Sequence, residues 1–350
     1  MVYLFHPYLL LFLGLVCLVL LACRKWVAAG VFGVAFVVLN CLTQSFGFRP
    51  FHVRSRKARG TISVLAYNIH GSGEDYDAQA LCRVIGRIRP DMLFLSEYSA
   101  SDKVLLEFVD SLYGGNADVC GEQLLASRFE MTELGTVPFS HFTRLTLPGG
   151  DGAGDGAGDG VGDGAGDGAG DGAGDGAGDG AGDGVEDGVG GGGLPLVVVT
   201  CHLPSNNYQD RLYFTPDSIQ DMGGLRRYLR NIDRVAVDRL EAARTIGDSI
   251  PKSVPCIVMG DMNDVSGSPA LDAFAAAGLE DAWWRGGLGF GPTIFNPVPF
   301  RIDHIMYSPS DLRLVRVRRI KSRGLGLHGN RLSDHDGLVA FFEYHWGQVI

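Results

Sequence analysis

The 350-residue sequence has no CxxC pair and no cluster of cysteine with histidine, and its seven cysteines are an odd number for a long chain. This pattern argues against a disulfide framework and against a zinc site. The chain also lacks the low hydrophobicity of a disordered protein. Because 46% of its residues are apolar and 20% are charged, we expect a substantial buried core.

Outside one tract, positive and negative charges nearly balance. Residues 149–193 form a DGAG repeat that holds 24 of the 51 glycines, ten regularly spaced aspartates and no lysine or arginine. With Glu186, these acids account for the formal net charge of −10, so the rest of the chain is nearly neutral. So much glycine is entropically costly to order, and the flanking segments TRLTL and LPLVVV are strand-like. The tract is therefore predicted to be a disordered low-complexity loop that lengthens a hairpin.

Two apolar runs open the sequence, at 8–23 and 26–39, with Arg24 and Lys25 between them. Each approaches the ~17–25 residues of a membrane-spanning helix, so we expect residues 1–45 to form a transmembrane helical hairpin. A signal peptide is the weaker alternative because no basic residue precedes the first run. A lipoprotein signal ending at Cys23 is opposed by the apolar residues that follow it. Two helices of a soluble core are opposed by the absence of a polar face.

A basic juxtamembrane linker is predicted at 46–60, where five lysines and arginines lie between positions 49 and 59. They outnumber the two basic residues of the hairpin, which favours a cytoplasmic domain by the positive-inside rule. The tight connection between the two runs leaves the opposite orientation open. In either case we expect a membrane protein whose basic linker contacts lipid headgroups.

The remaining chain, 61–346, alternates between strand-like and helix-like patterns, which predicts a single α/β domain. Strands are expected at 61–69, 91–96, 196–203, 255–259, 302–307 and 338–345, with shorter pieces within 122–147, and helices are expected at 77–89, 102–112 and 221–247. The helix at 77–89 has a capping residue, Asp77, at its start and Pro90 after its end.

Polar residues follow several of these strands, where α/β enzymes gather their ligands. The candidate site residues are Asn68, Glu97, His202, Asp261, Asn263, Asp303, Asp334 and His335. Each alone has an ordinary interpretation as a turn former, a solvated rim residue or a buried histidine. Their occurrence in order after successive strands is what favours a shared site.

The residue types indicate one kind of chemistry. Glu97, Asp334 and the amide oxygen of Asn68 are hard oxygen donors of the kind that binds Mg²⁺ or Mn²⁺. An aspartate such as Asp303 can orient a histidine such as His335 as an acid or base. The Asp261 motif can align an attacking water, while a histidine donates a hydrogen bond to the developing charge. The set suits metal-assisted displacement at phosphorus.

The order of these motifs resembles the endonuclease/exonuclease/phosphatase superfamily, which has the DNase I-like fold. The resemblance covers about 60–346. It depends on a strand ending in Asn, a PD…E segment, SRF, HL, GDMN, SPA, RIDHI and LSDH. The sequence departs from the family pattern at Glu130, where proline is usual, and at His304, where tyrosine is common.

The resemblance implies a four-layer α/β sandwich of two mixed β-sheets flanked by helices, here preceded by the transmembrane hairpin. It also implies roles for the residues. Glu97 would be the principal metal ligand, with Asn68 and Asp334 nearby. His335, oriented by Asp303, would be the catalytic histidine. The remaining assignments are nucleophile activation by Asp261 beside Asn263, and a phosphate contact from His202.

Three functions follow from this interpretation. The first is a membrane-anchored, Mg²⁺-dependent phosphodiesterase or endonuclease-like enzyme. The second is a phosphatase or phospholipase, sphingomyelinase-like, that acts on a lipid or a small phosphoester such as an inositol phosphate. The third is a non-catalytic, membrane-anchored binding module. The sequence offers no long basic stretch with interleaved aromatics, so it does not favour nucleic acid over phospholipid as the substrate. Membrane lipids are predicted partners, and no obligate protein partner is predicted.

Overall fold

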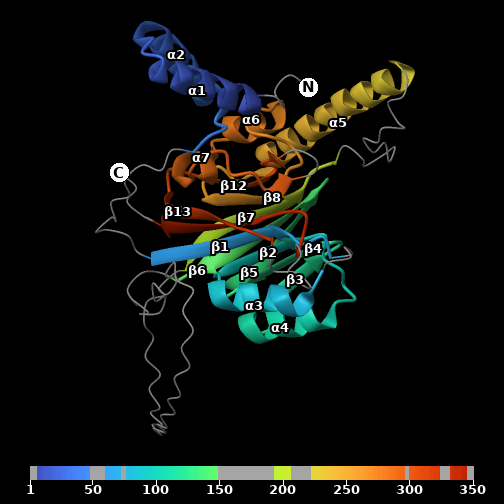
Figure 1. Ribbon diagram of the computed structural model, residues 1–350. Helices are drawn as coiled ribbons and strands as arrows, with labels where there is room; N and C mark the ends of the chain where they lie inside the picture. Colours follow the sequence, from blue (N-terminus) through green and yellow to red (C-terminus); the bar gives the residue numbers. More distant parts are fainter. Residues whose placement is uncertain are drawn as a thin grey trace, which may run out of the picture.

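The computed structural model describes residues 6–47, 60–71, 76–148, 193–205, 222–295, 299–323 and 332–344. Two antiparallel helices, α1 (His6–Ala22) and α2 (Trp26–Thr43), form a hairpin at one end of an α/β sandwich (Figure 1). The DGAG repeat and the basic residues between 49 and 59 lie outside the described residues, so the predictions made for them remain predictions.

The first sheet has six strands in the order β13-β14-β1-β2-β4-β3. Its strands are β1 (Gly60–Asn68), β2 (Met92–Ser96), β3 (Ala117–Cys120), β4 (Gln123–Ser127), β13 (Leu312–Ile320) and β14 (Gly337–Tyr344). The sheet is mixed, because β1 and β2 run parallel whereas the other neighbouring strands run antiparallel. All five residues of β2 are buried, which explains why its sequence, MLFLS, shows no polar alternation.

The second sheet also has six strands, in the order β5-β6-β7-β8-β12-β9. Its strands are β5 (Glu130–Val137), β6 (Ser140–Leu147), β7 (Leu194–His202), β8 (Cys256–Asp261), β9 (Glu280–Asp281) and β12 (Asp303–Tyr307). Here β7 and β8 are the parallel pair. A separate ribbon pairs β10 (Ile294–Phe295) with β11 (Pro299–Phe300).

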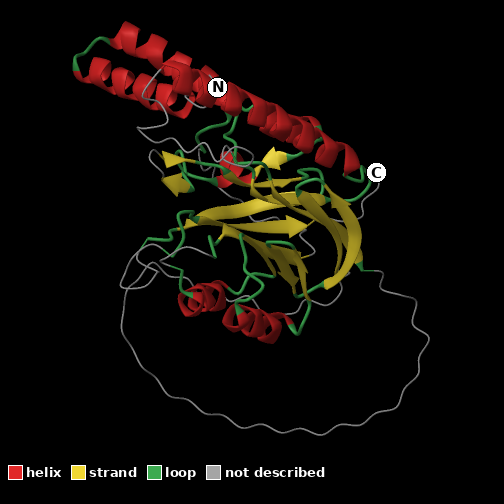
Figure 2. Ribbon diagram, turned by 90° about the vertical axis from the view of Figure 1, so that its right-hand side faces the viewer, coloured by secondary structure: helices red, strands yellow, loops and turns green. Residues whose placement is uncertain are grey.

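The two sheets pack face to face around one apolar core, and helices cover their outer faces (Figures 1 and 2). On the first sheet lie α3 (Ala78–Ile88) and α4 (Lys103–Tyr113). On the second lie α5 (Met222–Ser249) and α6 (Pro269–Ala276), whereas the short α7 (Ala282–Gly286) packs at the end of the core. The predicted arrangement of two mixed sheets with outer helices is therefore confirmed.

The local signals in the sequence account for most element boundaries. The side chain of Asp77 accepts a hydrogen bond of 3.1 Å from the amide of Ala80, and α3 ends just before Pro90, as predicted. The ends of β6 and β7 pair antiparallel, with Leu147 opposite Leu194, which confirms a hairpin on either side of the glycine-rich tract. Four elements, β3, β13, α6 and α7, were not predicted from the sequence.

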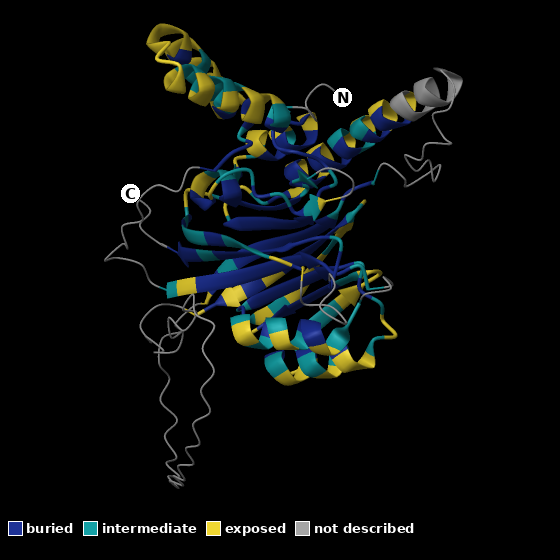
Figure 3. Cartoon of the chain, in the orientation of Figure 1, coloured by how far each residue is buried: buried dark blue, intermediate teal, exposed yellow. Residues whose placement is uncertain are grey.

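The N-terminal hairpin differs from the sandwich in its surface. In the described part of the chain, α2 is the one helix with the length and mean hydropathy, 2.0, of a membrane span, whereas the apolar α1 has 17 residues. Much of the hairpin's apolar surface faces outward, as Figure 3 shows, and Val27 and Leu42 are 86% and 72% exposed. Such exposure is unlike the core helix of a soluble protein. The transmembrane hairpin remains a prediction.

Candidate active site

Three neighbouring strands of the second sheet bring three candidate residues abreast. In the parallel pair β7–β8, His202 lies opposite Asp261, and in the antiparallel pair β8–β12, Asp261 lies opposite Asp303. Asp261 ends the central strand of the three, so it lies between the other two. The predicted convergence of residues from distant parts of the sequence thus follows from strand register.

A buried carboxylate–imidazole pair lies beside Asp261. The Nδ1 atom of His335 is 2.8 Å from the Oδ2 atom of Asp303, and both residues are buried. The opposite ring atom, Nε2, lies 3.7 Å from Oδ2 of Asp261. The pair therefore presents one ring nitrogen to Asp303 and the other toward the second carboxylate, which is the arrangement of an oriented acid or base.

The first sheet contributes Asn68 from the end of β1 and Glu97 from just after β2. The amide nitrogen of Asn68 donates to Glu97 at 2.8 Å and to Asp261 at 3.0 Å, so this side chain connects the two sheets at the site. Its amide oxygen accepts the backbone N–H of His70 at 3.1 Å. The amide oxygen, predicted to bind the metal, accepts this backbone N–H, while the amide nitrogen contacts two carboxylates. In this geometry Asn68 holds the two carboxylates in place.

The outer part of the site is more open to solvent. The Nε2 atom of His202 lies 3.9 Å from Glu97 and 3.8 Å from Asp261. On the other side of Glu97, the Nδ1 atom of His70 lies 3.4 Å from its carboxylate and 3.5 Å from that of Asp334. The side chains of Glu97 and Asp334 are 30% and 39% exposed. The buried residues thus form the floor of the site and these form its rim.

His70 is a site residue that the sequence analysis missed. It lies two positions after Asn68, just beyond the end of β1. Its place directly after an apolar strand is the signal that could have identified it. Ser333 was missed as well. Its hydroxyl donates to the carbonyl of Asn68 at 2.8 Å and accepts the N–H of His335 at 3.1 Å, which ties the two ends of the domain together.

Several site residues have a left-handed backbone, which is uncommon for residues other than glycine. The φ angles of His70, Glu97 and Asn263 are 45°, 54° and 49°. Such strain is typical of functional sites, where the surrounding structure holds it in place. Gly260, with a φ of 147°, is required for space, because a Cβ there would lie 1.9 Å from the carbonyl oxygen of Cys201. The GDMN motif therefore needs glycine at its first position.

The turn after β8 is held by its own hydrogen bonds. The backbone N–H of Asn263 donates to Oδ1 of Asp261 at 2.9 Å, and its side-chain amide donates to the carbonyl of Leu203 at 3.0 Å. The first bond fixes the orientation of the Asp261 carboxylate. The second connects this turn to the end of β7, next to His202. Asn263 thus positions the aspartate and the neighbouring loop together.

Burial and neighbouring charges shift the ionisation of the site. Burial alone would raise the pKa of Glu97, but hydrogen bonds from His70 and Asn68 lower this pKa to about 2. Burial and the charge of Asp303 raise the pKa of Asp261. Burial alone would lower the pKa of His335, but the charges of Asp303 and Asp261 raise this pKa to about 10. At neutral pH, Glu97 is therefore ionised and His335 is protonated.

The donor set fits a divalent metal ion. Ligand atoms of Glu97, His202 and Asp261 all lie within 4.8 Å of one another, and the same holds for Asp261, Asp303 and His335. Burial, together with repulsion from the neighbouring carboxylate of Asp303, raises the pKa of Asp261. A hard divalent cation would relieve this repulsion, and oxygen-rich ligand sets are those that Mg²⁺ and Mn²⁺ prefer.

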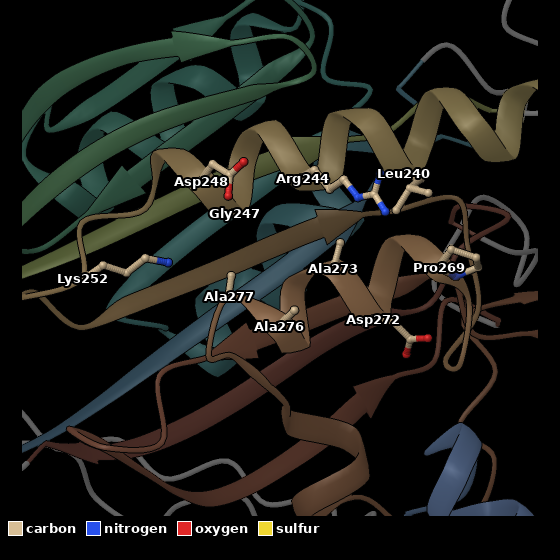
Figure 4. Close-up of a pocket in the computed structure, with 10 residues that line it drawn as sticks. All are labelled: Leu240, Arg244, Gly247, Asp248, Lys252, Pro269, Asp272, Ala273, Ala276 and Ala277. Carbon is tan, nitrogen blue, oxygen red and sulfur yellow. The ribbon is translucent and has the colours of Figure 1, made fainter.

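A pocket of about 420 Å³ elsewhere on the surface contains no candidate site residue. It lies between α5 and α6, and its lining includes Arg244, Lys252 and Asp272 together with small residues (Figure 4). This groove is formed by the two helices on the outer face of the second sheet, and none of the candidate residues at the strand ends lines it.

Residues 65–335 match the endonuclease/exonuclease/phosphatase family, so the chain belongs to this family. Members of the family are phosphoesterases and nucleases and generally depend on divalent metals.

Similar solved structures include D. rerio TDP2 complexed with single-stranded DNA product, with 14% identity, a TM-score of 0.49, and coverage of 81% of this chain and 99% of that one. A Beutenbergia cavernae family member has 17% identity, a TM-score of 0.48, and coverage of 83% and 73%. The human Nocturnin catalytic domain has 15% identity, a TM-score of 0.45, and coverage of 84% and 97%. No curated protein matches the sequence.

Proposed function

We propose that this chain is a membrane-anchored hydrolase of phosphoester bonds that uses Mg²⁺ or Mn²⁺ and acts as a phosphodiesterase of the endonuclease-like kind. The observation that carries the proposal is the sharing of one buried carboxylate, Asp261, by two groups. On one side lies the Asp303–His335 pair, and on the other lie Glu97 and His202. A single hydrolytic centre accounts for both groups.

The proposed organisation has three parts. Residues 1–45 form the membrane anchor, 46–60 form the linker, and 61–346 form the catalytic domain, interrupted by the loop at 149–193. The exposed apolar surface of the hairpin supports the anchor, because exposing so large an apolar surface to water is unfavourable. Each helix spans about 26 Å at 1.5 Å per residue, close to the ~30 Å of a bilayer core.

Glu97 is proposed as the principal metal ligand, with Asp334 and Asn68 beside it, and with Asn68 acting through its contact to Glu97. A bound Mg²⁺ supplies Lewis-acid polarisation of a phosphoryl oxygen. The lowered pKa of Glu97 supports this role, since the ligand is then ionised throughout the physiological range. His70 is proposed to keep the side chains of Glu97 and Asp334 in place, because its Nδ1 atom lies near both carboxylates.

The buried residues are proposed to carry the proton chemistry. Asp261 accepts a proton from the attacking water, and its raised pKa makes it a stronger base than an exposed aspartate. Protonated His335 donates a hydrogen bond to the phosphoryl oxygen on which negative charge builds, while Asp303 holds the ring. His202 contacts the same phosphate from the rim, and Asn263 fixes the direction of the base.

A phosphatase or phospholipase acting on a lipid is the second candidate, and one observation favours it. The hairpin exposes apolar side chains, and if it enters a bilayer it would keep the site near the membrane surface. Tethering raises the effective concentration of any substrate in that surface. Sphingomyelin or a phosphorylated inositol lipid would then be the substrate class.

The test is an assay of the full chain in detergent, with Mg²⁺ or Mn²⁺ and with EDTA, alongside His335→Ala. The substrates are plasmid DNA, RNA, sphingomyelin vesicles and p-nitrophenyl phosphate. We expect metal-dependent turnover of one class that the variant loses. Nuclease action should weaken steeply as salt rises, whereas hydrolysis of a small monoester should not. Metal binding without turnover of any substrate would refute the proposal and favour a binding module.

A further inference from the structure

The base of the hairpin is built into the catalytic domain. Gly47 and Gly289 exchange two backbone hydrogen bonds, of 3.0 and 2.9 Å, and Phe46 stacks on Phe290 with ring centroids 5.7 Å apart. Asn40, near the end of α2, holds this turn with hydrogen bonds to both backbone groups of Phe46, at 3.1 and 2.8 Å. The chain leaving the membrane anchor therefore docks in a defined register.

Both helices of the hairpin take part in this docking. At the start of α1, the Tyr8 hydroxyl donates to the carbonyl of Pro299 at 2.6 Å, and its ring contacts Phe300 edge-on at 5.7 Å. After α2, the carbonyl of Gln44 accepts from Arg301 at 3.3 Å. Arg301 is 1% exposed and is paired with Asp281 at 2.6 Å. These contacts all fall on residues 287–295 and 299–301, which we name the junction segment.

The opposite side of the junction segment holds the catalytic pair. The hydroxyl of Thr293 accepts the backbone N–H groups of Ile302 and Asp303, each at 3.1 Å. Its carbonyl accepts the N–H of Asp336 at 2.7 Å, and Ile294 forms a β-bridge with His335. Thr293 is fully buried. One segment therefore contacts the hairpin on one side and both members of the pair on the other.

We infer that the hairpin base is a positioning element of the active site, which acts through Thr293 on the Asp303–His335 pair. The anchor then does more than tether the enzyme, because its docking sets the geometry of the catalytic residues. The inference rests on the proposed function. It predicts that undocking the hairpin lowers turnover even of a soluble substrate, for which attachment to a membrane is irrelevant.

Gly47 offers a sharp way to undock the hairpin. A Cβ at this position would lie 2.4 Å from the carbonyl oxygen of Trp283 and 2.8 Å from the backbone of Gly287, so Gly47→Ala forces the two segments apart. Gly30→Ala is the matched control, because a Cβ at Gly30 in α2 meets nothing within 4 Å. Phe46→Ala is a second undocking variant that adds no atoms.

The full chain in detergent is assayed with Mg²⁺ on bis(p-nitrophenyl) phosphate, a soluble phosphodiester. We expect Gly47→Ala and Phe46→Ala to lower kcat about tenfold to a hundredfold with KM within about twofold, because small displacements of catalytic groups cost this much. Gly30→Ala should match the unmodified protein. Thr293→Val should also lower kcat, and Thr293→Ser, which keeps the hydroxyl, should restore most of it. Thermal melting by circular dichroism verifies that each variant is folded.

The outcomes separate the two proposals. If the unmodified protein shows no metal-dependent turnover of this probe or of the substrates named above, the proposed function fails. If it is active and folded Gly47→Ala and Phe46→Ala keep the kcat of Gly30→Ala, the positioning role of the hairpin is refuted. A rise in KM with kcat unchanged would also refute it, because that pattern indicates weakened substrate binding.

Discussion

The contact between Asp303 and His335 is the part of the site whose loss can be worked out most fully. In Asp303→Asn, the carboxylate 2.8 Å from Nδ1 becomes a neutral amide of the same shape. The ring then loses its charged partner and the tautomer that this partner selects. Unit charges about 4 Å apart interact by about 4 kcal/mol at an effective dielectric constant of 20, which corresponds to about 10³-fold in rate.

We therefore expect Asp303→Asn to lower kcat by about 10²- to 10⁴-fold with metal affinity retained. The assay is metal-dependent hydrolysis by the full chain, with isothermal titration of Mg²⁺ on the same samples. Asp110→Asn, a change of the same chemistry at an exposed position of α4, is the control and should leave kcat unchanged. A kcat for Asp303→Asn within about threefold of the unmodified protein would refute the assignment of the pair.

The same variant should change how stability depends on pH. The pKa of His335 is raised to about 10 in the folded protein, against an ordinary value of about 6.5. Its pairing therefore stabilises the fold fully below pH ~6.5, and this contribution is lost as pH rises through about 10. The difference in Tm between the unmodified protein and Asp303→Asn should be largest at pH 6 and should vanish above about pH 10. A difference that grows with pH would contradict this sign.

Three further predictions follow. Glu97→Gln should weaken Mg²⁺ binding at least about tenfold in a calorimetric titration, since a neutral amide is a poorer ligand, and unchanged affinity would remove Glu97 from the metal site. Asp281→Asn should cost about 3–5 kcal/mol in urea unfolding at pH 7, because Arg301 stays buried without its counter-charge. Burial alone would raise the pKa of Asp281, but the charge of Arg301 lowers it. The difference in unfolding free energy between the unmodified protein and Asp281→Asn should therefore shrink as pH falls below about 4, and a constant difference would count against the ion pair. Deleting 151–190 should leave kcat and Tm nearly unchanged, because β6 and β7 pair up to Leu147 and Leu194, and a large loss of either would show that the tract is more than a loop.

Local chemistry made much of the fold predictable. The Asp77 cap and Pro90 delimit α3, and the unbroken apolar run of β2 indicates a strand covered on both faces. By contrast, β13 was missed although its sequence, LRLVRVRRI, alternates, because its basic side chains resemble a solvated segment. One of them, Arg313, pairs with Glu343 on the neighbouring strand, a contact that depends on register.

The candidate site residues could be named from the sequence, but their relative geometry could not. Polar residues next to apolar strands indicated Asp261 and His335 as candidates, because strand ends are where ligands gather, and the structure brings the two side chains together. The orientation of the Asn68 amide could not be seen in the sequence, since it depends on two carboxylates that come from different sheets. The contacts of His70 with Asp334 and of Thr293 with Asp336 were not visible, because each joins residues that are distant in the sequence.

By itself, the sequence determined the classes of residue available and the local elements that hold them. Apolar periodicity, caps and turn residues act over a few positions, so they can be read without the fold. Tertiary structure alone decided that His202, Asp261 and Asp303 lie abreast, because strand order and register depend on the packing of the whole sandwich. It also decided that the hairpin docks through Gly47, since two backbones approach that closely only where neither has a side chain in the way.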